Sequence, residues 1–242
     1  MNTVAVPSAS RSIWAIIGDI FFAPIQALED FKKKPNWVVP FVLCLIVIVV
    51  ASGLPYKQNA KAQFDMMSTS TTLPPQVIEG MRSSAENPSP ITNTIGGVIG
   101  FSVVSLISAL LAWVIGSFIF GQKARYVHVW AVGLLVGLVP AIGTLLRSVL
   151  IVAKDSILVS LGPAALMAGS DFTSFVYSFL YFADVFAIWG IILGGLGYAA
   201  IFGLSRGKGM TISVIVWLII VLALVGLQQF GLAMAGVKTS FI

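Results

Sequence analysis

Two side chains of opposite charge stand out in this sequence because each interrupts a stretch that is otherwise apolar. Arg147 lies in the run 130–152 and Asp184 in the run 176–204. A charge within hydrocarbon costs on the order of 3 kcal/mol by insertion measurements, and it is usually paired or placed in a watery cavity. The two residues are therefore a candidate intramembrane charge pair. The alternative use of the same pair is as a proton or substrate site.

The two charges lie at similar depth if both runs cross a membrane. At 1.5 Å per residue, Arg147 lies about 7 Å and Asp184 about 12 Å below the same surface. We therefore predict that both side chains face the protein interior and neutralise each other. In the remaining alternative they do not touch: Arg147 extends outward to water, and Asp184 bonds a helix neighbour or stays protonated.

Other residues that carry chemistry are scarce. The chain has one histidine, His128, and one cysteine, Cys44. These numbers exclude a His/Cys metal cage and an intramolecular disulfide. The sequence also lacks the phosphate-binding loop, the zinc-protease motif and the serine-hydrolase motif. We expect no catalytic, cofactor-binding or metal-binding residues, and no enzyme activity.

Membrane helices must hold these residues. Of the 242 residues, 58% are hydrophobic and 10% are charged, whereas charged residues make up about 25% of an average soluble domain. An apolar run of about 18 or more residues indicates a transmembrane helix. We predict an all-α, polytopic integral membrane protein with five transmembrane helices, at residues 37–54, 95–120, 130–152, 176–204 and 210–234.

The rest of the chain is expected to lie outside the hydrocarbon. Residues 1–36 form a cytoplasmic or interfacial segment in which Ile13–Phe21 has the spacing of an amphipathic helix. Residues 37–242 form the five-helix membrane domain. Within that domain the polar stretch 55–94 is expected to be an exposed loop, with one short helix over 75–84 that starts at its prolines.

Basic residues near the ends of the spans predict the orientation. A cytoplasmic N-terminus places eight bases inside: Arg11, Lys32, Lys33, Lys34, Lys123, Arg125, Arg206 and Lys208. The opposite side keeps five bases: Lys57, Lys61, Arg82, Lys154 and Lys238. Five acids balance them: Asp65, Glu79, Glu86, Asp155 and Asp171. We expect the N-terminus in the cytoplasm and the C-terminus on the opposite side.

The net charge of +5 is spread over the ends of the spans, so no nucleic-acid partner is expected. Its strongest cluster is Lys32, Lys33 and Lys34, directly before the first span. A base near an anionic leaflet contributes about 1 kcal/mol of binding. These three lysines are therefore predicted to contact anionic lipid or an acidic partner.

Small residues recur every four positions in three of the predicted spans. They are Ser108, Ala112 and Gly116, then Gly133 and Gly137, then Gly190 and Gly194. Such stripes allow helices to approach closely, so we expect helix packing, with membrane partners or a second copy among the contacts. Pro140 is expected to kink the third span, because proline lacks the amide proton that a helix needs.

Five segments of the chain resemble, in the same order, bacterial proteins of the Yip1-domain family. They are PIQALEDFKKKPNWVVP (Pro24 to Pro40), PPQVIEGMRSSAENPSP (Pro74 to Pro90), ISALLAWVIG (Ile107 to Gly116), FLYFADVFAIWGIILGGLGYA (Phe179 to Ala199) and SRGKG (Ser205 to Gly209). The similarity covers about Pro24 to Met234. It implies a five-span protein, in a bacterium one of the inner membrane. Eukaryotic relatives associate with Rab-type GTPases and with one another.

These features favour a non-enzymatic membrane protein that organises the bilayer or recruits protein partners. The alternative is a small transporter or permease subunit that uses Arg147, Asp184 and the break at Pro140 for an unknown small molecule. A membrane enzyme would need a polar cluster open to one side, and the sequence offers none beyond that one pair.

Overall fold

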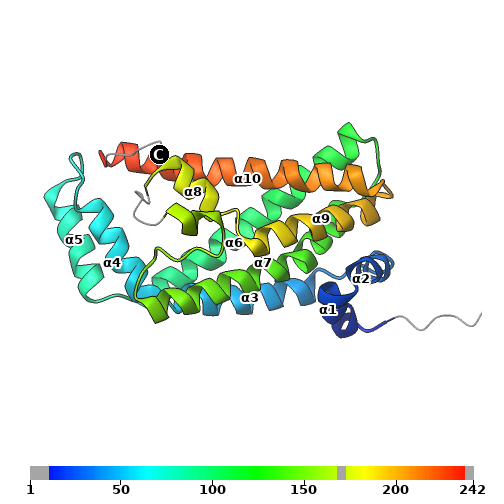
Figure 1. Cartoon of the computed structure of the whole chain (residues 1–242), viewed down its shortest axis with the longest axis horizontal. Coiled ribbons are helices and arrows are strands. Elements are labelled where there is room, and N and C mark those ends of the chain that lie inside the picture. The colour runs from blue at the N-terminus through cyan, green and yellow to red at the C-terminus, as the bar shows by residue number, and fades with distance from the viewer. Residues whose placement is uncertain (1–10, 168–172, 238–242) are drawn as a thin grey trace, which may run out of the picture.

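The computed structural model describes residues 11–167 and 173–237. Asp171 and Lys238, two of the residues counted for the orientation, lie outside these ranges. Every regular element within them is helical (Figure 1), so the predicted all-α fold is confirmed. The elements are α1 (Ile13–Phe22), α2 (Pro24–Phe31), α3 (Val38–Gly53), α4 (Tyr56–Met67), α5 (Pro75–Glu86), α6 (Pro90–Val114), the π-helical turn η1 (Ile115–Ile119), α7 (Tyr126–Lys154), the 3-10 turn η2 (Pro163–Met167), α8 (Phe175–Tyr181), α9 (Val185–Phe202) and α10 (Arg206–Met234).

Four helices in the described ranges are long and apolar enough to cross a bilayer: α6 with η1, α7, α9 and α10. The first predicted span, α3, has 16 residues. At 1.5 Å per residue it measures about 24 Å, less than the hydrocarbon core of about 30 Å. Together α3 and α4 pass the same test, but they meet at a bend of 60°. The polytopic membrane fold is confirmed, and the number of spans is five if this bent pair forms one.

The central helix is α7, which contacts α3, α6 and α9. Leu134, Leu135 and Val139 are buried in it, as expected of a helix that is apolar all round and surrounded by others. Helix α6 lies at the outside, and its Ile99 and Leu110 are exposed. In a membrane such a face contacts lipid or another membrane protein.

Helices α1 and α2 pack across one end of the bundle (Figure 1). Ile20, Leu28 and Phe31 are fully buried in a cluster that includes residues of α7. On the outer side Trp14 and Phe22 are 63% and 89% exposed. An exposed aromatic side on a helix at the end of a membrane bundle suits the boundary between headgroups and acyl chains.

The polar stretch 55–94 is more regular than the exposed loop that its composition predicted. It contains two helices, α4 and α5, which contact each other. The structure places a helix at the predicted 75–84 segment, but α4 was missed. Its sequence YKQNAKAQFDMM is rich in the strong helix formers Lys, Gln, Ala and Met. The helix propensity of these residues outweighs the polar character of the stretch.

The predicted continuous span 176–204 is wrong, because the chain forms two helices there, α8 and α9. Between them Asp184 adopts an extended backbone, and its carboxylate accepts a hydrogen bond from the amide of Ala187 at 2.7 Å. This bond caps the N-terminus of α9. Hydropathy cannot detect the break because both flanks are apolar, although an aspartate before an apolar run is a helix-start signal. Asp184 therefore begins a membrane helix instead of lying within one.

The MSTSTT loop between α4 and α5 fastens the C-terminal end of α10. Ser70 and Thr72 donate hydrogen bonds to the carbonyls of Ala235 and Met234. The Ser70 hydroxyl also accepts from the amide of Leu73 at 3.0 Å. The last carbonyls of a helix lack donors within the helix, so this loop caps α10 from a distant part of the sequence.

Ser70→Ala is expected to lower stability by about 1 kcal/mol, because the end of α10 loses a donor that is partly shielded from water. The measurement is the Tm of the purified protein in detergent. Ser68→Ala is the matched control, since the Ser68 hydroxyl donates only to the nearby carbonyl of Asp65. An equal Tm for the two variants would contradict the capping role.

Candidate functional site

Arg147 of α7 and Asp184 at the start of α9 form an ion pair through Nη2 and Oδ2. The structure thus brings together the two charges that the sequence placed at similar depth. Their side chains are only 12% and 8% exposed. Breaking a buried pair by removal of one partner typically costs about 3–5 kcal/mol, because the other charge is left without compensation. The contact therefore holds α9 against α7.

The pair is enclosed by further contacts. Both oxygens of Asp184 are used, since Oδ2 meets Arg147 and Oδ1 accepts the amide of Ala187. The guanidinium carbon of Arg147 lies 4.3 Å from the centroid of the Tyr181 ring, a distance at which a cation is attracted to an aromatic face. Sequence reasoning missed Tyr181; the available signal was an aromatic residue one helical turn before Asp184. Arg147 Nε is buried without a hydrogen-bond partner among the described residues.

Two glycines let the chain close around this pair. A Cβ on Gly162 would lie 2.7 Å from Cα of Asp184, and a Cβ on Gly143 would lie 2.5 Å from Cγ of Phe186. Real Cβ atoms do not approach so closely, so a larger residue would push the start of α9 outward. The loop 155–163 and α7 therefore both depend on small residues at this level.

The stripe on α9 is occupied by helices of the same chain. A Cβ on Gly190 would lie 3.4 Å from the ring of Pro140, and one on Gly194 would lie 2.6 Å from Oγ of Ser213. The Ser213 hydroxyl donates to the carbonyl of Ile191 at 2.8 Å. These positions therefore already serve packing against α7 and α10 of the same chain. An isoleucine at Gly190 is expected to disturb the fold of the chain itself.

The other small residues are used less uniformly. On α6, Ala112 is buried and Ser108 is half-buried, and Gly116 sits against the ring of Phe202. On α7, a Cβ on Gly133 would lie 3.7 Å from Tyr198 Oη, whereas one on Gly137 would meet no atom within 4 Å. Only part of the predicted stripes therefore requires small residues for packing.

Pro140 lies inside α7, which continues unbroken from Tyr126 to Lys154. The Thr144 hydroxyl donates to the carbonyl of Pro140 at 3.0 Å. The Pro140 ring lies 3.4 Å from the position of a Cβ on Gly190 of α9. The proline therefore takes part in the contact between α7 and α9.

At the other end of the bundle, α1 and α2 share the end at which the turns before α7 and α10 lie (Figure 1). The three acids of this end are all paired with bases: Asp19 with Arg11, Glu29 with Lys32, and Asp30 with Lys33 and Arg11. Two of the three predicted contact lysines therefore face a carboxylate of their own helix. Five bases of this end make no ion pair with a described residue: Lys34, Lys123, Arg125, Arg206 and Lys208.

The contacts of Asp30 and Arg11 shift the pKa values of both groups toward their charged forms. The hydrogen bond from Lys33 at 2.6 Å, with a further contribution from Arg11, lowers the pKa of Asp30 below its ordinary 3.8. The hydrogen bond to Asp19 raises the pKa of Arg11. A carboxylate whose pKa is lowered in the folded state contributes stability above its ordinary pKa and loses it as the pH falls below. The stabilising contribution of the Asp30 carboxylate is therefore present at physiological pH.

The single cysteine and the single histidine are the other two side chains that the sequence offered for chemistry. The Cys44 thiol is buried and donates to the carbonyl of Leu134 at 3.6 Å, and His128 lies in the first turn of α7. Across the described ranges, no three His, Cys, Asp or Glu residues are placed to hold a metal ion.

A bundle of membrane-length helices with one enclosed charge pair defines an integral membrane protein of the helical class. The sequence model of the Yip1 domain family matches residues 18–227 of this chain. The chain therefore belongs to the Yip1 domain family, whose members are generally non-enzymatic membrane proteins. No curated protein and no solved structure matches the chain.

A double-mutant cycle tests the ion pair. Arg147→Met and Asp184→Asn should each lower the Tm in detergent more than the double variant does, because each single change strands a buried charge. Asparagine keeps the N-cap, whereas Asp184→Ala should cost about 1 kcal/mol more. Strictly additive losses in the cycle would contradict a direct interaction between the two charges.

Proposed function

We propose that this Yip1 family member is a non-enzymatic protein that organises the membrane by recruiting an acidic partner to its basic end. One observation carries the proposal. The three acids at this end are already paired with bases, whereas five further bases form no ion pair with any described residue. Their positive charge is available to an approaching surface within a Debye length, about 8 Å at physiological salt. The name basic end refers to the part of the bundle that carries these five bases: Lys34, Lys123, Arg125, Arg206 and Lys208.

The geometry refines the prediction based on the lysine cluster. Arg206 and Lys208 belong to the first turn of α10, where Ser205 caps the helix by accepting the amide of Lys208 at 3.5 Å. Lys208 Nζ lies 5.7 Å from the centroid of the Phe120 ring, so two turns of the chain meet here. These bases are held on helical elements, which favours a defined contact surface.

A second contact type concerns the bilayer. The outer face of α6 is apolar and includes Gly96 and Gly100, at which a Cβ would meet no atom within 4 Å. Unlike the stripe on α9, this one is free of internal contacts. It supports packing against a membrane partner or a second copy of the chain.

The transport alternative finds less support. Arg147 and Asp184 satisfy each other, and Asp184 also caps α9. A translocation site needs polar groups that are free to exchange partners, whereas these groups are committed to the fold. We therefore assign the pair a structural role.

Binding of a fluorescein-labelled polyglutamate peptide to the purified protein tests the proposal. The double change Arg206→Gln with Lys208→Gln should weaken binding about fivefold for each base, corresponding to about 1 kcal/mol each, and should reduce the dependence on salt. Lys33→Gln is the matched control, because Lys33 already faces Asp30. Unchanged affinity in the double variant, or an equal loss in the control, would overturn the proposal.

The proposal also requires the basic end to face the cytoplasm, with the C-terminus on the opposite side. Single cysteines at Thr69 and Gln122, in a Cys44→Ala background, test this by labelling of intact cells with an impermeant reagent. Gln122 is preferable to the neighbouring Gly121, whose φ of +67° disfavours other residues. Only the cysteine at Thr69 should react; reaction at Gln122 alone would mean the reverse orientation.

A further inference from the structure

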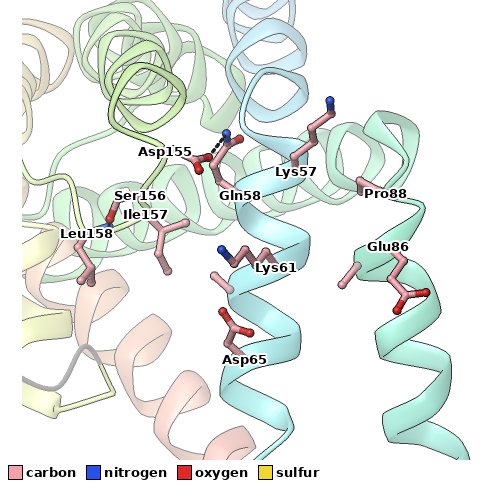
Figure 2. A pocket seen from close by; sticks show the side chains of 12 residues that line it. Lys57, Gln58, Lys61, Asp65, Glu86, Pro88, Asp155, Ser156, Ile157 and Leu158 are labelled. Carbon is pink, nitrogen blue, oxygen red and sulfur yellow. Dashed lines mark hydrogen bonds between the residues drawn. The ribbon is translucent and has the colours of Figure 1, made fainter.

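A cavity of about 520 Å³ lies at the end of the bundle opposite α1 and α2. It is lined by α4, the end of α5 and the turn that follows α7. Figure 2 shows that Gln58, Lys61 and Asp65 occupy the side of α4 that faces this turn; Lys57 and, at the end of α5, Glu86 also line the cavity. The size is within the range of about 300–1,000 Å³ that is common for small-molecule sites.

The backbone of the turn fixes Asp155 toward α4. Asp155 ends α7 in the left-handed conformation, with a φ of +47°, which aspartate tolerates better than most residues. Its carboxylate accepts a hydrogen bond from Gln58 Nε2 at 2.9 Å. Asp155 is thereby held across the cavity from Lys61 and Asp65.

The charges in this cavity are unlike those at the basic end, because both signs are present and none of them forms an ion pair with a described residue. Lys61 and Asp65 are four residues apart on one helix, a spacing at which opposite charges often pair. Neither they nor Asp155 forms an ion pair with a described residue. With Lys57 and Glu86, which also line the cavity, charged groups of both signs therefore face the same space with capacity for a ligand.

The cavity continues into a second one of about 310 Å³. The two share Ala62, Ile157 and Leu158 in their walls. The second cavity is bounded by Ile151 of α7 and by Tyr177, Tyr181 and Phe182 beside the ion pair. The groove therefore changes from charged at the outer end to largely apolar and aromatic toward the membrane helices.

We propose that this groove binds a phospholipid with an ethanolamine headgroup. The phosphate lies at Lys61, and the primary ammonium donates a hydrogen bond to Asp65, about one turn further along α4. One acyl chain follows the aromatic wall toward Ile151. A zwitterion matches the mixed charge, and a primary ammonium suits the Asp65 carboxylate better than a quaternary one, which has no proton to donate. The site is separate from the basic end and does not depend on recruitment of a partner there.

The test uses delipidated protein in nonionic detergent and measures the affinity for added lipid by native mass spectrometry. Phosphatidylethanolamine should bind more tightly than phosphatidylcholine or phosphatidylglycerol. Lys61→Gln and Asp65→Asn should each weaken its binding about tenfold, the effect of losing one charge-assisted hydrogen bond. Arg82→Gln and Glu79→Gln are matched controls on α5 that line neither cavity, and they should bind as the wild type does.

Several results would overturn the proposal. Equal affinity for the three lipids would show that the headgroup is not read, and unchanged binding by Lys61→Gln and Asp65→Asn would place the lipid elsewhere. Equally tight binding of water-soluble phosphoethanolamine would mean a site for a free phosphoamine. The lipid-free Tm of each variant verifies folding, and Asp65→Glu, which keeps the charge, should recover most of the affinity.

Discussion

The contact between Arg147 and Asp184 is the interaction on which the membrane part of this protein depends. Burying a charge without an opposite charge beside it costs several kcal/mol of folding stability. Here the central helix α7 carries Arg147, and Asp184 stands at the start of its neighbour α9. Because Asp184 also caps α9, one carboxylate determines both where this helix begins and which helix it packs against. Helix α8 and the loop that follows α7 both contact this pair, through Tyr181 beside Arg147 and through Gly162 beside Asp184.

Close helix contacts follow from this anchor. With the start of α9 fixed, Gly190 lies against Pro140 and Gly194 against Ser213, so α9 packs tightly on α7 and α10. Side chains on these positions would separate helices that have no hydrophobic force to join them in lipid, where packing and hydrogen bonds supply the attraction. The small residues therefore serve the internal structure first. The free small residues, Gly96 and Gly100, lie on the outside of α6.

Hydropathy and charge predicted most of the architecture, since long apolar runs have few alternatives in a membrane. The sequence also placed Arg147 and Asp184 near the same end of neighbouring spans, although the depth of Asp184 was calculated along a helix that in fact breaks before it. The break itself was not predicted, since a hydropathy window averages across one polar residue. The stripes on α9 indicated close packing correctly in kind, but periodicity cannot tell whether the neighbouring helix belongs to the same chain. Tyr181 and Asp155 act through tertiary contacts, to Arg147 and Gln58, which lie far away in the sequence.

The two ends of the bundle differ in charge, and this difference is the basis of the proposed recruitment; the ion pair supplies the rigid frame between them. Hydrogen exchange at the Ala187 amide tests that frame most directly. In the wild type this amide should be protected, and in Arg147→Met it should exchange at least about tenfold faster, because Asp184 loses the partner that holds it. The capped amide of Lys208 in α10 should not change. Equal protection of Ala187 in both proteins would contradict the account.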